Sequence, residues 1–191
     1  MKEFLIEKKP RLSIVIAIVF FVVNILTQTI PMLSNFLVLY PHNLYEPQSW
    51  YRFLTYPLYV GGLLNWIHFS LVIILTGYII ENRTNEKLIY TILILSTVIG
   101  GLVCAIFNQN QPIDVSIGSP TIIAWGFWSA AVVAGIKLWH SLAKFERWIL
   151  ILCFVYTLNI TIGNLGSFLS QISVILIIAL YCLIRRKFSQ K

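Results

Sequence analysis

The stretch Ser116–Gly135, SIGSPTIIAWGFWSAAVVAG, decides how the rest of the chain is arranged. It opens with a turn-like segment at residues 118–120 and then runs apolar as far as Leu138, interrupted only by Lys137. Small residues recur on more than one side of a helix, at Ala124, Gly126, Ser129, Ala130, Ala131, Ala134 and Gly135. Because small residues let neighbouring backbones approach closely, the pattern predicts a helix at the centre of a membrane bundle.

The composition of the whole chain is that of an integral membrane protein. Of its 191 residues, 58% are hydrophobic and 11% are charged, and the mean hydropathy is +0.83. A soluble domain carries roughly 25% charged residues, so this chain has too little polar surface to cover itself in water. Its length leaves room for one domain, and we predict a single all-α membrane domain over residues 1–191.

Six apolar segments predict six transmembrane helices. They are Leu12–Ile30, Leu63–Ile80, Leu88–Phe107, Thr121–Leu138, Trp148–Ile162 and Leu165–Ile184. The fourth and fifth are short for a hydrocarbon layer of about 30 Å at about 1.5 Å per residue. Short helices fit where surrounding protein shelters them, so the fourth segment is predicted to be a short, buried central helix.

The positive charges predict the topology. Every Lys and Arg except Arg52 lies in one of four places: before the first segment, between the second and third, around the link from the fourth to the fifth, or after the sixth. With six crossings, these four places are all on the same side of the membrane. The positive-inside rule makes that side cytoplasmic, so residues 1–11 and 185–191 are predicted to be cytoplasmic tails of a multi-pass cell-membrane protein. The net charge of +7 then reflects topology, and we expect membrane lipid and no nucleic acid as a partner.

The external part of the chain combines aromatic and polar residues. Residues 31–62 form a long aromatic loop, which we expect to lie at the outer leaflet. Polar residues also gather near the outer ends of four segments, at Asn65, His68, Ser119, Asn159 and Asn164. Such groups need partners or water inside a membrane, so they indicate either a water-accessible outer pocket or interhelical hydrogen bonds. The spacing of Cys and His predicts no metal site, and we expect no cofactor.

In their order along the chain, these features resemble the rhomboid family of intramembrane serine proteases. Residues 50–81, WYRFLTYPLYVGGLLNWIHFSLVIILTGYIIE, look like the family's Trp-Arg loop followed by its second helix. Gly100 and Gly101 are similar to the glycine of its third helix, residues 116–126 look like its Gly-x-Ser-Gly nucleophile region, and residues 163–167, GNLGS, resemble the start of its sixth helix. The resemblance implies a six-helix rhomboid-like bundle and acyl transfer by a Ser–His dyad with an oxyanion hole.

The sequence departs from the family at the residues that carry its chemistry. The family's catalytic His falls on Asn164, which cannot accept a serine proton near pH 7. The oxyanion His of the second helix falls on Asn65, which keeps an N–H donor, and the family's helix-two Asn falls on Phe69, which has none. The resemblance therefore predicts the scaffold together with an emptied dyad.

The identity of the nucleophile is open in this sequence. Ser119 follows Gly118, but the family's small residue eight positions after the nucleophile matches Gly126 only if Gly118 fills the serine position. Pro120 suits a first helical turn, so Ser119 is also a candidate N-cap. His68 is the one His inside a predicted span, about 100° round the helix from Phe69, where a buried, hydrogen-bonded role is expected rather than that of a base.

Three functions follow from these observations. The first is a non-proteolytic, pseudoprotease-like membrane protein that binds transmembrane segments of partner proteins. The second is an active intramembrane serine endopeptidase that uses Ser119. The third is a small-molecule-binding membrane subunit of a transporter, although the sequence lacks a set of charged groups that would hold a polar ligand.

Overall fold

The structure is a computed structural model that describes residues 10–84, 86–110, 120–160 and 165–184. These ranges contain helices and no β-strand. The α-helices are α1 Arg11–Thr29, α2 Pro31–Leu37, α3 Arg52–Thr55, α4 Leu63–Arg83, α5 Glu86–Phe107, α6 Thr121–Lys137, α7 Lys144–Ile160 and α8 Leu165–Ile184. Short 3-10 helices are η1 Pro41–Tyr45, η2 Pro47–Ser49, η3 Tyr56–Leu58 and η4 Trp139–Ser141.

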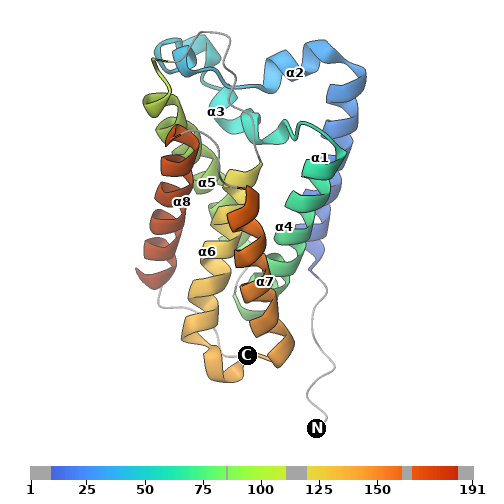
Figure 1. The fold of residues 1–191 in the computed structure, drawn as a ribbon, viewed down its shortest axis with the longest axis vertical. Coiled ribbons are helices and arrows are strands. Elements are labelled where there is room, and N and C mark those ends of the chain that lie inside the picture. The colour runs from blue at the N-terminus through green and yellow to red at the C-terminus, as the bar shows by residue number, and fades with distance from the viewer. Residues whose placement is uncertain (1–9, 85, 111–119, 161–164, 185–191) are drawn as a thin grey trace.

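Each of the six predicted apolar segments coincides with a long helix (Figure 1). Within the described residues, α1, α4, α5 and α8 are long and apolar enough to cross a membrane, and α6 is a shorter apolar helix of 17 residues. The largest difference is at α7, which begins at Lys144 and not at Trp148. Its first turn stays helical because the Glu146 carboxylate accepts a hydrogen bond from the Ala143 N–H at 2.8 Å. The chain is therefore a helical, multi-pass membrane protein in its architecture.

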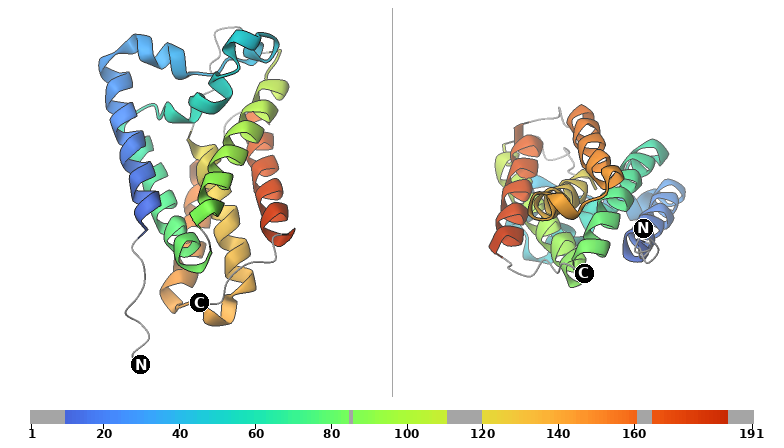
Figure 2. Two further views of the ribbon diagram at one scale, coloured as in Figure 1. Left: turned by 180° about the vertical axis from the view of Figure 1, so that it is seen from behind. Right: turned by 90° about the horizontal axis from the view of Figure 1, so that it is seen from below.

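Helix α6 lies at the centre of the bundle, as predicted. It contacts α4, α5, α7 and α8, and the view along the bundle shows these helices around it (Figure 2). All but a few of its residues are buried. Most of its surface therefore faces protein, which is why a helix too short to span the membrane alone is stable there.

The small residues of α6 account for this close packing on several sides. A Cβ at Gly126 would overlap the Ser96 side chain of α5. A Cβ at Gly135 would lie 2.6 Å from Leu150 Cδ1 of α7. On a further side, the Ser129 hydroxyl donates to the Ile175 carbonyl of α8 at 2.8 Å. These positions serve contacts within the chain, so they are closed to an incoming partner helix.

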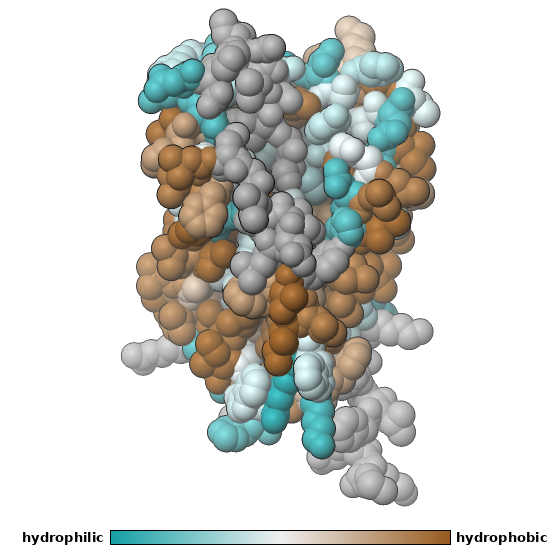
Figure 3. All heavy atoms as spheres, in the orientation of Figure 1, coloured by the Kyte–Doolittle hydropathy of each residue, from teal (hydrophilic) through white to brown (hydrophobic). Residues whose placement is uncertain are grey.

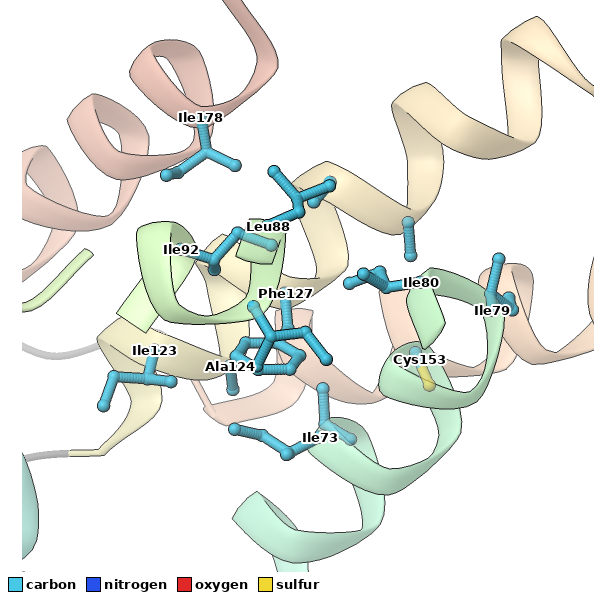
Figure 4. Packing of buried hydrophobic residues seen from close by; sticks show 14 of the residues in the cluster. Ile73, Ile79, Ile80, Leu88, Ile92, Ile123, Ala124, Phe127, Cys153 and Ile178 are labelled. Atoms are coloured by element: carbon cyan, nitrogen blue, oxygen red, sulfur yellow. The ribbon is translucent and has the colours of Figure 1, made fainter. Parts of the chain in front are cut away.

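Branched and aromatic side chains fill the space between α6 and its neighbours. Ile73 of α4, Ile92 of α5 and Ile178 of α8 are fully buried and belong to the same hydrophobic cluster as Phe127 of α6 (Figure 4). This core fixes the positions of four helices relative to one another.

The carboxylate of Glu81 joins the C-terminal end of α4 to the first turn of α1. Glu81 of α4 accepts hydrogen bonds from the Ser13 N–H at 2.8 Å, the Ser13 hydroxyl at 2.6 Å and the Leu12 N–H at 3.2 Å. It thereby caps the first turn of α1, where N–H groups lack helical partners. Gly77 allows this approach, because a Cβ there would lie 2.6 Å from Ser13 Cβ.

Residues 31–62 fold onto the C-terminal end of α5, at the end of the bundle that we call outer after the topology predicted from the charges. Tyr56 is fully buried, and its hydroxyl donates to the Thr97 carbonyl at 3.2 Å. The ring fits because α5 has glycines beneath it: a Cβ at Gly101 would lie 2.9 Å from Tyr56 Cε1 and 3.1 Å from Phe53 Cδ1. The close approach at this glycine pair is thus made partly by the loop. Burial raises the pKa of the Tyr56 phenol well above its ordinary value, and nearby Cys104 adds to the effect.

Candidate functional site

The outer end of α4 is positioned by backbone features that only glycine tolerates well. Gly61 and Gly62 precede the helix with φ values of 72° and 134°, in the region that disfavours residues with a Cβ. The Gly62 N–H donates to Oδ1 of the buried Asn24 on α1 at 3.2 Å. The Trp66 indole N–H donates to the Ala17 carbonyl of the same helix at 2.9 Å. These contacts fix the first turn of α4, which carries Asn65, and thereby position His68 on the next turn.

Asn65 is exposed at this end of the bundle. Its amide nitrogen lies 3.5 Å from the Gly61 carbonyl oxygen, at the limit of a hydrogen bond. The amide is therefore held weakly and remains available to donate to another group. The assignment of an oxyanion-type donor role to Asn65 stays a prediction.

His68 and Phe69 follow on the next turn and differ in their surroundings. His68 is half-buried. Phe69 is buried, and its ring centroid lies 4.5 Å from that of Phe20 on α1. Phe69 is thus a packing residue between α1 and α4, at the position where the family resemblance places a polar amide.

The remaining predicted site residues lie outside the described residues. These are Gly118, Ser119 and Asn164, together with the side chain of Asn159. The structure begins again at the buried Pro120, which occupies the N-cap of α6, so the helix starts one residue later than the expected cap at Ser119 would place it. The carbonyl of Pro120 accepts from the Ile123 N–H at 3.0 Å.

Sequence reasoning missed a set of buried polar groups in the outer half of the bundle. Within the part of the chain that the structure describes, these side chains have buried polar atoms without a hydrogen-bond partner: Ser70, Ser96, Trp125, Ser170 and Gln171. Trp125 on α6 and Gln171 on α8 lie one turn above Ser129 and Ile175, which are hydrogen-bonded to each other. An indole N–H and an amide oxygen are therefore buried at similar depth on adjacent helices.

Asn108 shows the other way in which a polar residue is accommodated. It is buried at the outer end of α5, and its amide donates to the Cys104 carbonyl at 2.8 Å. On α8, a Cβ at Gly166 would lie 2.7 Å from Asn108 Cγ. Gly166 thus leaves the space that the Asn108 amide fills. The start of α8 therefore packs on an amide that directly follows the third predicted segment, Leu88–Phe107.

The described residues offer limited chemistry. They contain no group of three or more His, Cys, Asp or Glu side chains placed to hold a metal ion, and Cys104, Cys153 and Cys182 are buried and form no disulfide among the described residues. The described part of the candidate site therefore consists of Asn65 and His68 on α4, and Gly118, Ser119 and Asn164 lie outside the described residues.

Comparison with known protein families, curated proteins and solved structures finds no match to this chain. The architecture alone supports a multi-pass membrane protein.

Proposed function

We propose that the chain is a rhomboid-like polytopic membrane protein that has lost proteolysis and binds transmembrane segments of partner membrane proteins. The order of the elements supports this proposal: an aromatic loop folded on the third long helix, a second long helix ending in Gly and Glu, and a short buried fourth long helix.

One observation carries the loss of proteolysis. Asn164 stands where the family resemblance places the catalytic base, and an amide cannot take a proton from serine. Phe69 strengthens the argument, because its ring is packed against Phe20 and offers no donor to a substrate oxygen. A chain that keeps the scaffold without the base retains the means to bind a membrane helix but not to cleave it.

The experiment that tests this is labelling of the purified protein with a fluorophosphonate probe, which reports an activated serine. The native chain should not be labelled, and Asn164→His should gain labelling because it restores a base. Ser119→Ala in the Asn164→His background is the matched control for the labelled residue. Labelling of the native chain that disappears in Ser119→Ala would show that Ser119 is active and would overturn the proposal.

A second candidate, an active protease, is favoured by one observation: Ser119 follows Gly118 directly before the buried helix α6. The same labelling experiment decides between the two. The transporter-subunit hypothesis predicts co-purification with an ATPase and a bound small molecule, which mass spectrometry of the purified protein would detect.

The surface for a partner helix has to lie outside α6, whose small residues face neighbouring helices. On α4, Leu64 and Leu71 are 72% and 48% exposed and flank Asn65 and His68 on the lateral face. A photo-crosslinking residue at Leu64 or Leu71 should capture a membrane protein in cells. The control position is Leu176 of α8, which is 63% exposed on another helix. Equal capture from Leu176 would contradict a specific docking face on α4.

A further inference from the structure

The connection between α6 and α7 places aromatic and basic side chains together on the surface. Trp139, Phe145 and Trp148 are 44%, 64% and 62% exposed. Lys144 is exposed beside them, and Arg147 is half-buried. Lys144, Arg147 and Trp148 are three and four residues apart, so they share one face of the first turns of α7. We refer to Trp139, Lys144, Phe145, Arg147 and Trp148 as the basic-aromatic turn.

The negative charge of this segment is turned inward. Glu146, the one acid between residues 137 and 148, is 1% exposed. Its carboxylate accepts from Arg83 Nε at 3.1 Å and from Arg83 Nη2 at 2.8 Å, and also from the Ala143 N–H. Because Arg83 neutralises Glu146 inside the bundle, the charges of Lys144 and Arg147 on the outside are left uncompensated.

Arg147 is half-buried and packs against Trp139. Its guanidinium carbon lies 4.8 Å from the centroid of the Trp139 ring, and Nη2 donates to the Trp139 carbonyl at 2.9 Å. The contact also orders the indole of Trp139. Nε is buried without a partner among the described residues, so the N–H groups left for a ligand are on Nη1 and Nη2. Guanidinium groups recognise phosphate oxygens by paired hydrogen bonds.

The basic-aromatic turn lies at the end of the apolar surface. Directly after it, α7 exposes Ile151, Leu152 and Val155, and on α6 the residue before Lys137 is Ile136, which is 71% exposed. Figure 3 shows the same change, from a hydrophobic band to hydrophilic residues at the lower end of the molecule. Exposed Trp residues at such a boundary sit at the level of lipid headgroups.

We propose that the basic-aromatic turn is a binding site for the phosphate headgroup of an anionic phospholipid. Lys144 and Arg147 supply donors and charge, and Trp139 and Trp148 hold the site at headgroup depth. Pairing of the buried Glu146 with Arg83 keeps a carboxylate from repelling the phosphate. A zwitterionic headgroup gains less, because its cationic end is repelled by the same two side chains. The inference depends on neither partner binding nor loss of proteolysis.

The test uses the full chain reconstituted in phosphatidylcholine vesicles, with spin-labelled phosphatidylglycerol or spin-labelled phosphatidylcholine as the probe. Electron paramagnetic resonance gives the association constant of each lipid. The native chain should prefer phosphatidylglycerol, and Lys144→Gln and Arg147→Gln should each lower that preference about fivefold, since a surface charge is worth about 1 kcal/mol to an anionic lipid.

Arg11→Gln is the matched control. Arg11 is exposed at the start of α1, on the same end of the bundle but away from the turn (Figure 2). The Arg11→Gln substitution removes the same net charge as Lys144→Gln or Arg147→Gln and should leave the lipid preference unchanged. Lys144→Gln breaks no contact of Trp139, so it separates charge from any change in the fold of the turn. No preference in the native chain, no loss in Lys144→Gln, or an equal loss in Arg11→Gln would each overturn the proposal.

Discussion

The ion pair between Arg83 and Glu146 joins the end of α4 to the start of α7, and its two members differ sharply in exposure. The Glu146 side chain is 1% exposed and that of Arg83 is 22% exposed, with 2.8 Å between Nη2 and Oε2. Replacing each residue by Met removes a charge while keeping much of the side-chain volume. The two substitutions should therefore have unequal effects on the free energy of unfolding.

Arg83→Met should be the more destabilising change. It leaves the buried carboxylate of Glu146 with only the Ala143 N–H as partner, and an uncompensated buried charge costs about 3–5 kcal/mol. Glu146→Met leaves a guanidinium that already reaches solvent, so its cost should be about 1–3 kcal/mol, close to that of lost charged hydrogen bonds. The double variant holds neither charge and should be more stable than Arg83→Met alone.

The assay is denaturant unfolding of the purified chain in mild detergent, followed by tryptophan fluorescence, with all three variants in a double-mutant cycle. Lys144→Met is the control on the same turn, since an exposed Lys away from such pairs should change stability by less than about 0.5 kcal/mol. If Glu146→Met cost as much as Arg83→Met, or if the double variant cost the sum of both, the argument from unequal burial would be refuted.

Three further predictions concern the outer half of the bundle. Gly101→Ala should loosen the loop and destabilise the chain by about 1–3 kcal/mol, because its Cβ would lie 2.9 Å from Tyr56 and 3.1 Å from Phe53; faster proteolysis of the loop would reveal it. Burial raises the pKa of Tyr56, so the stability that the neutral phenol contributes should be complete below about pH 10 and fall as pH rises further. Tyr56→Phe should lose that alkaline dependence. It should also cost about 1 kcal/mol, because the hydrogen bond to the Thr97 carbonyl is removed. Gln171→Leu should be neutral or stabilising by about 1 kcal/mol in thermal unfolding, because the Gln171 oxygen is buried without a partner among the described residues; a loss of stability there would show that the amide is satisfied.

The helices could be predicted from the sequence because hydropathy and charge act along the chain. An apolar segment bounded by Lys or Arg reports its span locally, so the ends of α1, α4, α5 and α8 fall within a few residues of the predicted segments. The burial of α6 was also predictable, since small residues on several sides and a short length both favour a sheltered helix. Only the start of α7 was misplaced, because its charged first turn looks polar while Glu146 is bonded inside.

The sequence does not predict which segments pack against the glycines of the helices, because these contacts are between residues far apart in the chain. Gly100 and Gly101 indicate that something approaches α5, but whether a helix or a loop does so depends on how residues 31–62 fold back. The structure shows both, with Ile122 of α6 against Gly100 and Tyr56 against Gly101.

Polar residues in apolar helices show most clearly why a site is harder to derive than a fold. Asn24, Asn108 and Gln171 are similar in the sequence: Asn24 and Gln171 are amides in apolar runs near the outer end of a helix, and Asn108 directly follows such a run. Asn24 accepts from the Gly62 backbone, Asn108 bonds within its own helix and fills the space left by Gly166, and the oxygen of Gln171 is unpaired among the described residues. The position of an amide in a membrane-spanning helix therefore predicts its depth in the bundle and shows that it needs a hydrogen-bond partner. Its role depends on which glycine or backbone group the neighbouring helix presents. The same reasoning applies to Asn65 and Asn164: the loss of a titratable base follows from residue type alone, whereas the use to which the amides are put has to be measured.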